Sequence, residues 1–182
     1  MGSPHEVSGA AHVAGRTALR LEGVAPSVEA RLKGLRELMK DAGARMEELG
    51  TLESRAFWRE VRDVVPLKAA PDAVVWKISC PPTEGPAILK RIKAERPAVQ
   101  AFYDWSGGMI WLALPPSTDA DHTIVRGALG ATGGHATLIC APEAVRAAVA
   151  VFQPQSPALA ALAARVKESF DPKGLFNPGR MG

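Results

Sequence analysis

The chain has 182 residues, of which 47% are apolar and 23% are charged, with 17 glycines and 15 prolines. This composition is that of an average globular domain, which excludes a collagen-like chain, a disordered chain and a small disulfide-stabilised protein. No apolar stretch is long enough to span a bilayer. Twenty-two basic against 19 acidic residues leave a net charge of +3, without the concentrated positive charge of a nucleic-acid-binding protein. We therefore expect a cytoplasmic domain with no nucleic-acid partner.

The first quarter of the chain carries one clear pattern. Residues 1–15 are small and polar and show no period, which predicts an extended lead-in or a cloning remnant. Residues 17–22 alternate apolar and polar, as in a half-buried strand. Between Val28 and Leu49 apolar residues recur every three or four positions. This spacing predicts one amphipathic helix of about six turns, and a shorter helix is predicted at 52–61.

The middle of the chain sets the topology. The predicted elements, in order, are a strand at 73–80, a helix at 83–95, strands at 98–105 and 109–114, a helix ending near residue 129, and a strand at 135–140. This β-α-β-β-α-β order is that of ferredoxin-like folds. We therefore predict an α+β fold, an antiparallel sheet with the N-terminal strand and long helix added and helices mainly on one face. The open face is where we look for a ligand.

The C-terminal segment is the most distinctive part of the sequence. Apolar residues at helical spacing, with Pro157 at the start, predict a last helix up to Phe170. The sequence FDPKGLFNPGRM follows at 170–181, where two prolines and two glycines fix a looped path. Such a rigid, non-periodic end is typical of a segment that follows a surface, and a single small domain gives no reason for one.

Four side chains are candidates for a site. His135 opens the last predicted strand after two glycines, and it is either a catalytic group or a hydrogen-bonded structural histidine. Lys77 lies inside an apolar strand, where its ammonium would meet an anion, or where it protects a sheet edge. Arg59 and Arg62 lie on the short helix; guanidinium groups suit carboxylates, although surface ion pairs are the commoner use.

Aromatic residues gather on the predicted hairpin. Tyr103, Trp105 and Trp111 occupy matching alternate positions, which suits core packing or a platform that stacks on a flavin or a base. With Phe102 they would form the face of an RNA-binding sheet, so RNA binding is an alternative function.

The C-terminal segment resembles the end of FAD-linked oxidases of the vanillyl-alcohol oxidase type, which close with FDPxGxFNPG followed by Lys or Arg. Residues 57–63 and 76–81 are similar to the tryptophan–arginine helix and the lysine strand of the D-2-hydroxyacid dehydrogenase cap domain. With 18–23 and 133–138 added, the chain most resembles the cap and C-terminal portion of the FAD-binding, E-type subunits of glycolate oxidase.

The resemblance implies a division of the chain and roles for its residues. Residues 16–170 would be the cap, or substrate, domain, and 171–182 a tail that returns to an FAD domain. Because residues 1–15 cannot hold FAD, we expect a fragment that is inactive alone. The resemblance puts Lys77 and Arg62, or Arg59, near the substrate carboxylate. It puts Asn177 and Arg180 against the flavin domain.

The implied activity is oxidation of a small 2-hydroxyacid, glycolate to glyoxylate, with electrons passing to FAD. The implied partners are sister flavin and iron–sulfur subunits, and the implied location is cytoplasmic, with any membrane association made through the complex. The alternative is a non-catalytic subunit for assembly or electron relay. Related dehydrogenases carry HxGDGNxH, whereas residues 130–137 keep only His135. One imidazole holds a divalent ion poorly, so we predict no metal.

Overall fold

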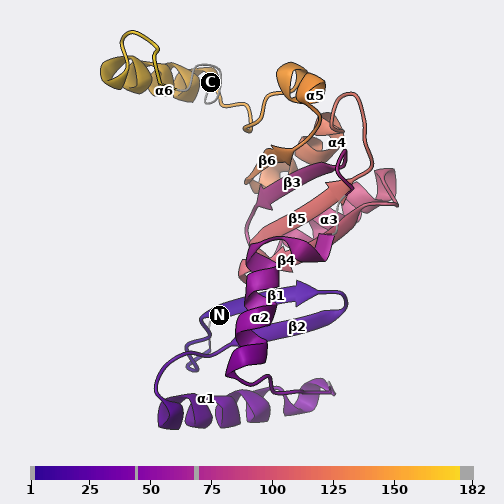
Figure 1. The fold of residues 1–182 in the computed structure, drawn as a ribbon, viewed down its shortest axis with the longest axis vertical. Coiled ribbons are helices and arrows are strands. Elements are labelled where there is room, and N and C mark those ends of the chain that lie inside the picture. Colours follow the sequence, from indigo (N-terminus) through magenta and orange to yellow (C-terminus); the bar gives the residue numbers. More distant parts are fainter. Residues whose placement is uncertain (1–2, 44, 68–69, 177–182) are drawn as a thin grey trace.

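The computed structural model describes residues 3–43, 45–67 and 70–176, and its centre is a six-stranded antiparallel sheet (Figure 1). The strands are β1 (Gly9–Val13), β2 (Arg16–Arg20), β3 (Val74–Ser79), β4 (Gln100–Asp104), β5 (Met109–Leu114) and β6 (His135–Cys140). Their order in the sheet is β2-β1-β4-β5-β3-β6.

The helices lie around this sheet. They are α1 (Ala25–Leu38), α2 (Thr51–Arg62), α3 (Gly85–Glu95), α4 (His122–Gly127), α5 (Glu143–Ala148) and α6 (Pro157–Phe170). Short 3₁₀ turns are η1 (Lys40–Ala42), η2 (Val65–Leu67), η3 (Trp105–Gly107) and η4 (Gly130–Thr132).

The predicted fold class is confirmed. The elements β3-α3-β4-β5-α4-β6 follow the ferredoxin-like order, and their strands lie as β4-β5-β3-β6. The hairpin β1–β2 extends the sheet beyond β4, because β1 pairs with β4 at His12 and Tyr103. The N-terminal strand therefore adds to the sheet, as the sequence predicts.

Alternation along β3 divides the sheet into two faces. Val74, Trp76 and Ile78 are fully buried against α3 and α4 and form the main core. Trp76 also donates its indole N–H to the carbonyl of Ala120 at 3.0 Å. The intervening residues of β3, among them Lys77, are half-buried and point to the opposite face.

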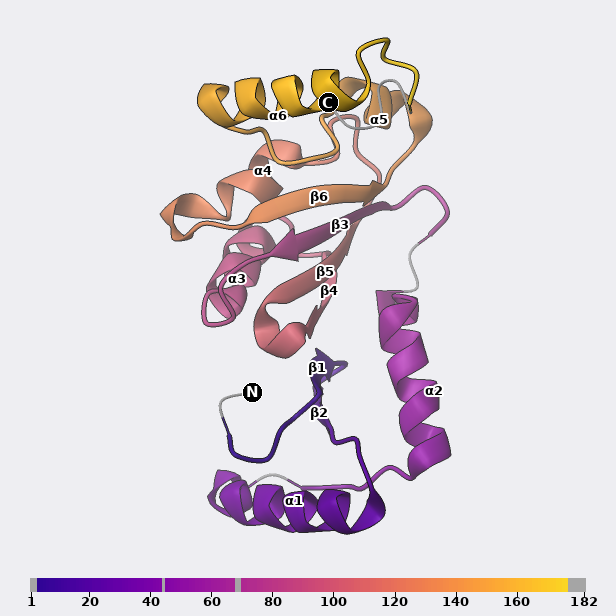
Figure 2. The same cartoon turned by 90° about the vertical axis from the view of Figure 1, so that its left-hand side faces the viewer.

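That opposite face is partly covered by a helix. Figure 2 shows α2 across the sheet from α3 and α4. A second core lies beneath α2, where Val61 of α2 and Leu67 meet Phe102 of β4 and Ala113 of β5. The half of this face formed by β3 and β6 keeps Lys77 half-buried and His135 exposed.

The prediction for residues 1–15 is wrong for 9–13, which form β1. Ala10 and Ala11 are buried on its two faces, and β1 pairs with β2 along its whole length. Small residues have weak strand propensity, and a strand buried on both faces shows no alternation. The burial that makes this segment a strand comes from the rest of the fold.

The prediction of one helix from Val28 to Leu49 is also wrong. Helix α1 ends at Leu38, and the turn that follows ends at Gly43, whose φ of 62° is left-handed. A left-handed glycine is a common helix terminator. Met46 and Leu49 continue the apolar period, but they remain 49% and 41% exposed and form no helix. The shorter helix predicted at 52–61 is confirmed as α2.

Helix α6 begins at Pro157 as predicted and projects from the sheet (Figure 1). None of its residues is buried. Its apolar stripe, called here the α6 stripe, is 50% to 82% exposed and consists of Leu159, Leu162, Val166 and Phe170.

The described part of the tail is shaped by Asp171. Its carboxylate accepts the N–H groups of Leu175 and Phe176 at 2.9 and 2.8 Å. These bonds hold the pKa of Asp171 below its usual range. Leu175 and Phe176 themselves are about 70% exposed, at 69% and 72%. The tail therefore has a defined turn whose apolar side chains lie outside the domain's interior.

No helix among the described residues is long and apolar enough to cross a membrane.

Candidate functional site

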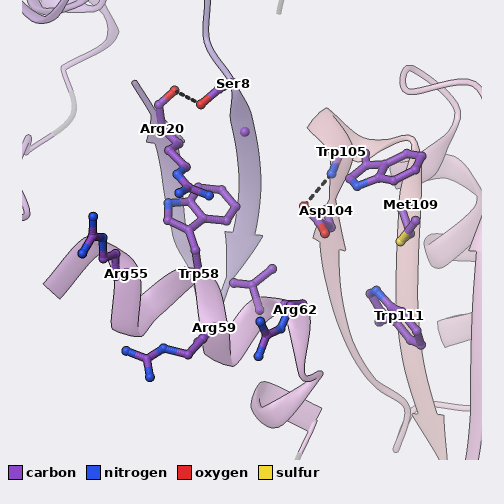
Figure 3. Close-up of a pocket in the computed structure, with 12 residues that line it drawn as sticks. Ser8, Arg20, Arg55, Trp58, Arg59, Arg62, Asp104, Trp105, Met109 and Trp111 are labelled. Atoms are coloured by element: carbon purple, nitrogen blue, oxygen red, sulfur yellow. Dashed lines mark hydrogen bonds between the residues drawn. The ribbon is translucent and has the colours of Figure 1, made fainter. Parts of the chain in front are cut away.

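A groove of about 690 Å³ lies between α2 and the β4–β5 hairpin, with β1 and β2 at one end (Figure 3). We call it the arginine–tryptophan groove. Its lining includes Arg20, Arg55, Trp58, Arg59, Arg62, Asp104, Trp105, Met109 and Trp111.

The first wall of the groove is a row of arginines on α2. Arg55, Arg59 and Arg62 are spaced i, i+4 and i+7, which places them on one side of the helix over about 10 Å. Phe57 and Val61 pack toward the sheet. The packing of these apolar residues therefore fixes the direction in which the arginines point.

The arginines differ in how far they are neutralised. Arg62 binds Asp63 through two hydrogen bonds, of 2.7 and 3.0 Å. This pairing lowers the pKa of Asp63, mainly through the hydrogen bond, and raises the pKa of Arg62. Within the described residues neither Arg55 nor Arg59 has an ion-pair partner. The surface-ion-pair interpretation thus holds for Arg62, whereas Arg59 forms no direct ion pair and only helps, through its charge, to lower the pKa of Asp63.

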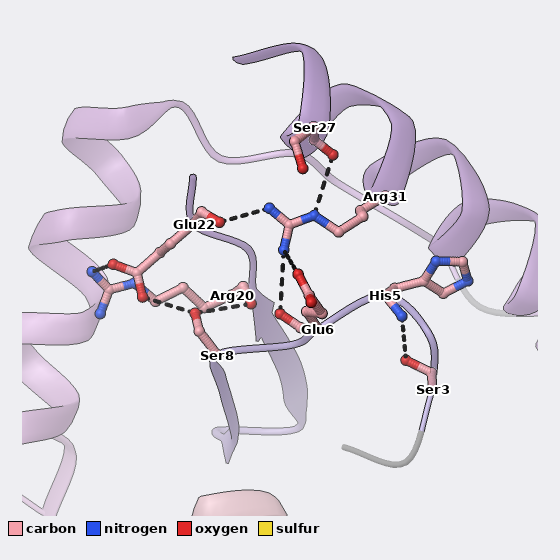
Figure 4. A network of polar contacts seen from close by, with 8 residues as sticks. All are labelled: Ser3, His5, Glu6, Ser8, Arg20, Glu22, Ser27 and Arg31. Atoms are coloured by element: carbon pink, nitrogen blue, oxygen red, sulfur yellow. Dashed lines mark hydrogen bonds and ion pairs between the residues drawn. The ribbon is translucent and has the colours of Figure 1, made fainter. Parts of the chain in front are cut away.

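Arg20 closes one end of the groove. Its guanidinium lies 6.0 Å from the centre of the Trp58 ring and binds Glu22 at 2.8 Å. Ser8 also donates to Glu22, at 2.8 Å (Figure 4). Arg31 of α1 donates a hydrogen bond to the backbone carbonyl of Glu22 at 2.6 Å. This bond connects α1 to the segment that follows β2. A side chain at Gly9 would contact Trp58 at 3.2 Å, so glycine there lets the indole lie against β1.

The second wall comes from the β4–β5 hairpin. Asp104 is half-buried, and its carboxylate accepts the N–H of Trp105 at 2.8 Å. Desolvation raises the pKa of Asp104, although the hydrogen bond opposes this effect. Trp105 is 67% exposed, and Trp105 and Ser106 have φ values of 50° and 58°. Left-handed backbone at two successive non-glycine residues is strained, and such strain gathers at ligand sites.

The register of the sheet places Lys77 beside this wall. Lys77 lies opposite Trp111 on one side and Thr137 on the other. Its ammonium is 6.0 Å from the centre of the Trp111 ring. Because β3 lies between β5 and β6, the interpretation of Lys77 as an edge-strand lysine is wrong.

His135 lies apart from the groove. It is opposite Ser79 at the start of β6, on the same sheet face as Lys77, and its side chain is exposed. Strand spacing puts it about 10 Å from the line of β5. Of the predicted site residues, Arg59 and Arg62 line the groove with Trp111, Lys77 lies outside the lining but next to Trp111, and His135 lies apart from both. Asn177 and Arg180 lie outside the described residues.

Of the two interpretations of the hairpin aromatics, core packing is confirmed for Tyr103 and Trp111, which pack against the two cores, and no shared platform forms. Tyr103 lies opposite Ile110 and packs against the main core, whereas Trp111 points to the groove. Phe102 is 2% exposed. The aromatic residues are divided between two faces, so the RNA-binding alternative loses the feature that suggested it.

The sequence interpretation missed Arg20, Arg55 and Asp104 as groove residues. The spacing of Arg55 with Arg59 and Arg62 would have identified the first arginine of the row. No sequence signal joins Arg20 to Trp58, because they are brought together by the pairing of β1 with β4.

Comparison with known proteins defines the class first. Residues 148–181 match the family described as "FAD linked oxidases, C-terminal domain". This match covers α6 and the whole tail motif, and it indicates FAD as the cofactor. The described residues hold no group of three or more metal-ligating side chains.

A particular relative is the glycolate oxidase subunit GlcE of Escherichia coli (strain K12), which is 31% identical over 179 residues. The aligned segment is 98% of this chain and 42% of the relative, so the chain spans less than half the length of GlcE. Together the two comparisons confirm the resemblance: the chain is similar to the C-terminal portion of FAD-linked oxidases.

The helix N-termini of the described residues are not suited to the diphosphate of FAD. A helix N-terminus binds phosphate through free backbone N–H groups and a favourable dipole. Every described helix has a proline or an acidic side chain at that end, which removes a donor or repels an anion. These residues are Pro26, Glu53, Pro86, Asp121, Glu143 and Pro157. The groove offers arginines and indoles, a donor set that suits a carboxylate with a flat or apolar neighbour.

Replacing Asp104 with Asn is expected to stabilise the chain at pH 7 by less than about 1 kcal/mol, because the carboxyl is partly solvated. Burial raises the pKa of Asp104 in the folded state. The stability that protonated Asp104 contributes is therefore complete below its ordinary pKa and is lost as pH rises through the raised value. Urea unfolding at pH 3 and pH 7 measures the effect. The exposed Asp72→Asn is the control, and an equal gain for Asp104→Asn at both pH values would contradict this assignment.

Proposed function

We propose that this chain is the substrate-side portion of an FAD-linked oxidoreductase that oxidises 2-hydroxyacids to 2-oxoacids, with glycolate converted to glyoxylate. The observation that carries the proposal is the groove that Arg59 and Arg62 line together with Trp111, whose ring centre lies 6.0 Å from the ammonium of Lys77. Guanidinium and ammonium groups are the usual partners of a substrate carboxylate. The similarity to GlcE supports glycolate, since that protein is by name a subunit of glycolate oxidase.

In this proposal the chain binds and orients the substrate. Arg59 offers an unpaired guanidinium, Arg62 adds a second one held in place by Asp63, and Lys77 approaches from the sheet. Trp111 and Met109 form the floor and keep water away from the bound acid. When bound, FAD accepts the electrons, and it would be held mainly by another part of the protein. His135 is proposed as a catalytic group that approaches the substrate only in the complete assembly.

The same proposal assigns the ends of the chain. Residues 16–170, to which β1 adds, would be the substrate domain, and 171–182 the tail that lies along the flavin-holding part. Asn177 and Arg180 would then contact that part. The exposed α6 stripe supports this assignment, because 50% to 82% of each side chain is available for burial.

We propose sister flavin and iron–sulfur subunits as the partners, by analogy with a glycolate oxidase complex. The location would be cytoplasmic, with any membrane contact made through the complex. A non-catalytic role in assembly or electron relay is the second candidate, and the position of His135 outside the groove favours it.

Lys77→Met in the complete oxidase separates these two functions. If Lys77 binds the substrate carboxylate, KM for glycolate is expected to rise about tenfold or more, as for the loss of a charged hydrogen bond. Size-exclusion chromatography would show an intact complex. Lys90→Met, on the exposed side of α3, is the matched control. A variant complex that falls apart while its remaining intact fraction keeps the original KM would favour the assembly role.

A further inference from the structure

The arginine–tryptophan groove is larger and more aromatic than glycolate requires. Glycolate has a carboxylate and a hydroxyl group but no side chain. The groove has a volume of about 690 Å³ and is open to solvent, so it leaves room beside a bound glycolate. Trp58 and Trp111 already pack against the second core, but glycolate bound to Arg59 would leave the exposed ring of Trp105 uncovered.

We propose that this groove accepts 2-hydroxymonocarboxylic acids with an aromatic or large apolar substituent and binds them more tightly than glycolate. The inference rests on the proposed function, since it takes the groove as the site of the substrate carboxylate. It adds the class of substituent, which the similarity to GlcE does not supply.

The two walls of the groove match the two parts of such a molecule. Figure 3 shows Arg55, Arg59 and Arg62 on α2, and Trp105, Met109 and Trp111 on the hairpin across from them. A carboxylate held at the helix would direct its substituent toward the indoles and the thioether. Aromatic rings gain from burial and from offset or edge contacts with other rings.

Trp105 is the residue that most directly suggests an aromatic ligand. Its ring is 67% exposed at the rim of the groove, and its backbone is held in a left-handed conformation by the turn and by the bond to Asp104. A large apolar ring in this position gains free energy when a ligand covers it. The strained backbone is consistent with a position kept for binding, since such strain is concentrated at ligand sites.

Asp104 limits the class to monocarboxylates. It lines the hairpin wall, which would receive the substituent, and Asp63 lies beside Arg62 at the helix wall. A second carboxylate on the ligand would meet the negative charge of Asp104 in a partly desolvated place. Acids such as 2-hydroxyglutarate should therefore bind more weakly than an apolar acid of similar size.

The test is a set of binding titrations with the 182-residue chain. Tryptophan fluorescence and calorimetry measure the binding. The probes are 3-phenyllactate, glycolate, 2-hydroxyglutarate and 3-phenylpropanol, which lacks the carboxylate. We expect 3-phenyllactate to bind about tenfold more tightly than each of the others. Its advantage over glycolate is the burial of the ring, and its advantage over 3-phenylpropanol is the charged hydrogen bond.

Variants assign the two walls. Trp105→Ala is expected to weaken the binding of 3-phenyllactate about tenfold more than that of glycolate, and Trp105→Phe should restore most of the loss. Arg59→Gln should weaken both acids. Phe152→Ala, at an exposed apolar residue outside the groove lining, is the control. Unchanged thermal unfolding of each variant shows that the fold is intact.

Equal binding of glycolate and 3-phenyllactate would overturn the inference, as would an equal effect of Trp105→Ala on both acids. Absence of binding by any 2-hydroxyacid would also overturn it. Turnover by the complete oxidase separates this failure from that of the proposed function. An oxidase that turns over glycolate and ignores 3-phenyllactate keeps the proposed function and loses this inference.

Discussion

Replacing Arg59 and Arg62 together with Gln in the complete oxidase is expected to lower kcat/KM for its 2-hydroxyacid by about 100-fold or more. Each charged hydrogen bond to a carboxylate contributes about 1.5–3 kcal/mol, and every 1.4 kcal/mol is about tenfold. The loss should exceed this sum, because removing Arg62 leaves Asp63 unpaired near the bound anion.

The single variants should differ in size. Arg62 is already neutralised by Asp63, so Arg62→Gln removes less free positive charge than Arg59→Gln. Asp63→Asn is expected to act in the opposite direction and to lower KM, since it frees the Arg62 guanidinium. Arg146→Gln on the exposed side of α5 provides a control with the same change of charge. Steady-state kinetics that place the double variant within threefold (about 0.7 kcal/mol) of the unmodified oxidase would remove these arginines from the site.

A second large effect is expected on α6. Leu162→Asp with Val166→Asp should leave the 182-residue chain as stable as before, because these side chains are 50% and 51% exposed. In the complete oxidase the same pair should reduce the bound flavin by about tenfold or more, since two carboxylates would be buried without partners. The ratio of flavin to protein absorbance in the purified oxidase measures this effect.

The matched control for this experiment lies on the other side of the same helix. Ala164→Asp changes the charge in the same way, about half a turn away from the α6 stripe. It should leave the flavin content unchanged. Equal losses on both sides of α6 would show a general charge effect, and a drop in the stability of the 182-residue chain would show that the stripe packs within this domain.

The ferredoxin-like core was predictable because its signals are local. Each of its strands is an apolar run with a breaker at its end, and α3 carries Ile88, Leu89 and Ile92 at helical spacing, all of them buried. The strand at 9–13 had no such signal, because Ala10 and Ala11 become strand residues only when the sheet buries both faces. The prediction of one long helix was wrong for the opposite reason. The apolar period continues past Gly43, but Met46 and Leu49 remain exposed and form no helix.

The residue types of the candidate site could be predicted from the sequence, but the arrangement of these residues in space could not. Lys77, Arg59 and Arg62 were identified because charged groups in apolar or aromatic surroundings are unusual. Whether Lys77 faces the same side as α2 depends on the register of β3 with β5, and this register is set by the packing of Trp76 in the core. The pairing of Arg62 with Asp63 and the exposed position of Trp105 likewise follow from tertiary structure.

Three observations bear on where FAD is bound. The described helices have proline or acidic residues at their N-terminal ends, the α6 stripe is exposed, and residues 148–181 match the C-terminal domain of FAD-linked oxidases. These three observations agree if this portion contributes substrate binding and one contact surface, while the diphosphate of FAD is bound by another part of the protein.

The most direct test is to incubate the 182-residue chain with excess FAD, remove the free cofactor by gel filtration, and measure the flavin that remains. The account predicts far less than one flavin per chain, together with equimolar flavin in the complete oxidase treated in the same way. Equimolar flavin retained by the 182-residue chain would contradict the account, because the chain would then hold by itself the cofactor that we assign to another part of the protein.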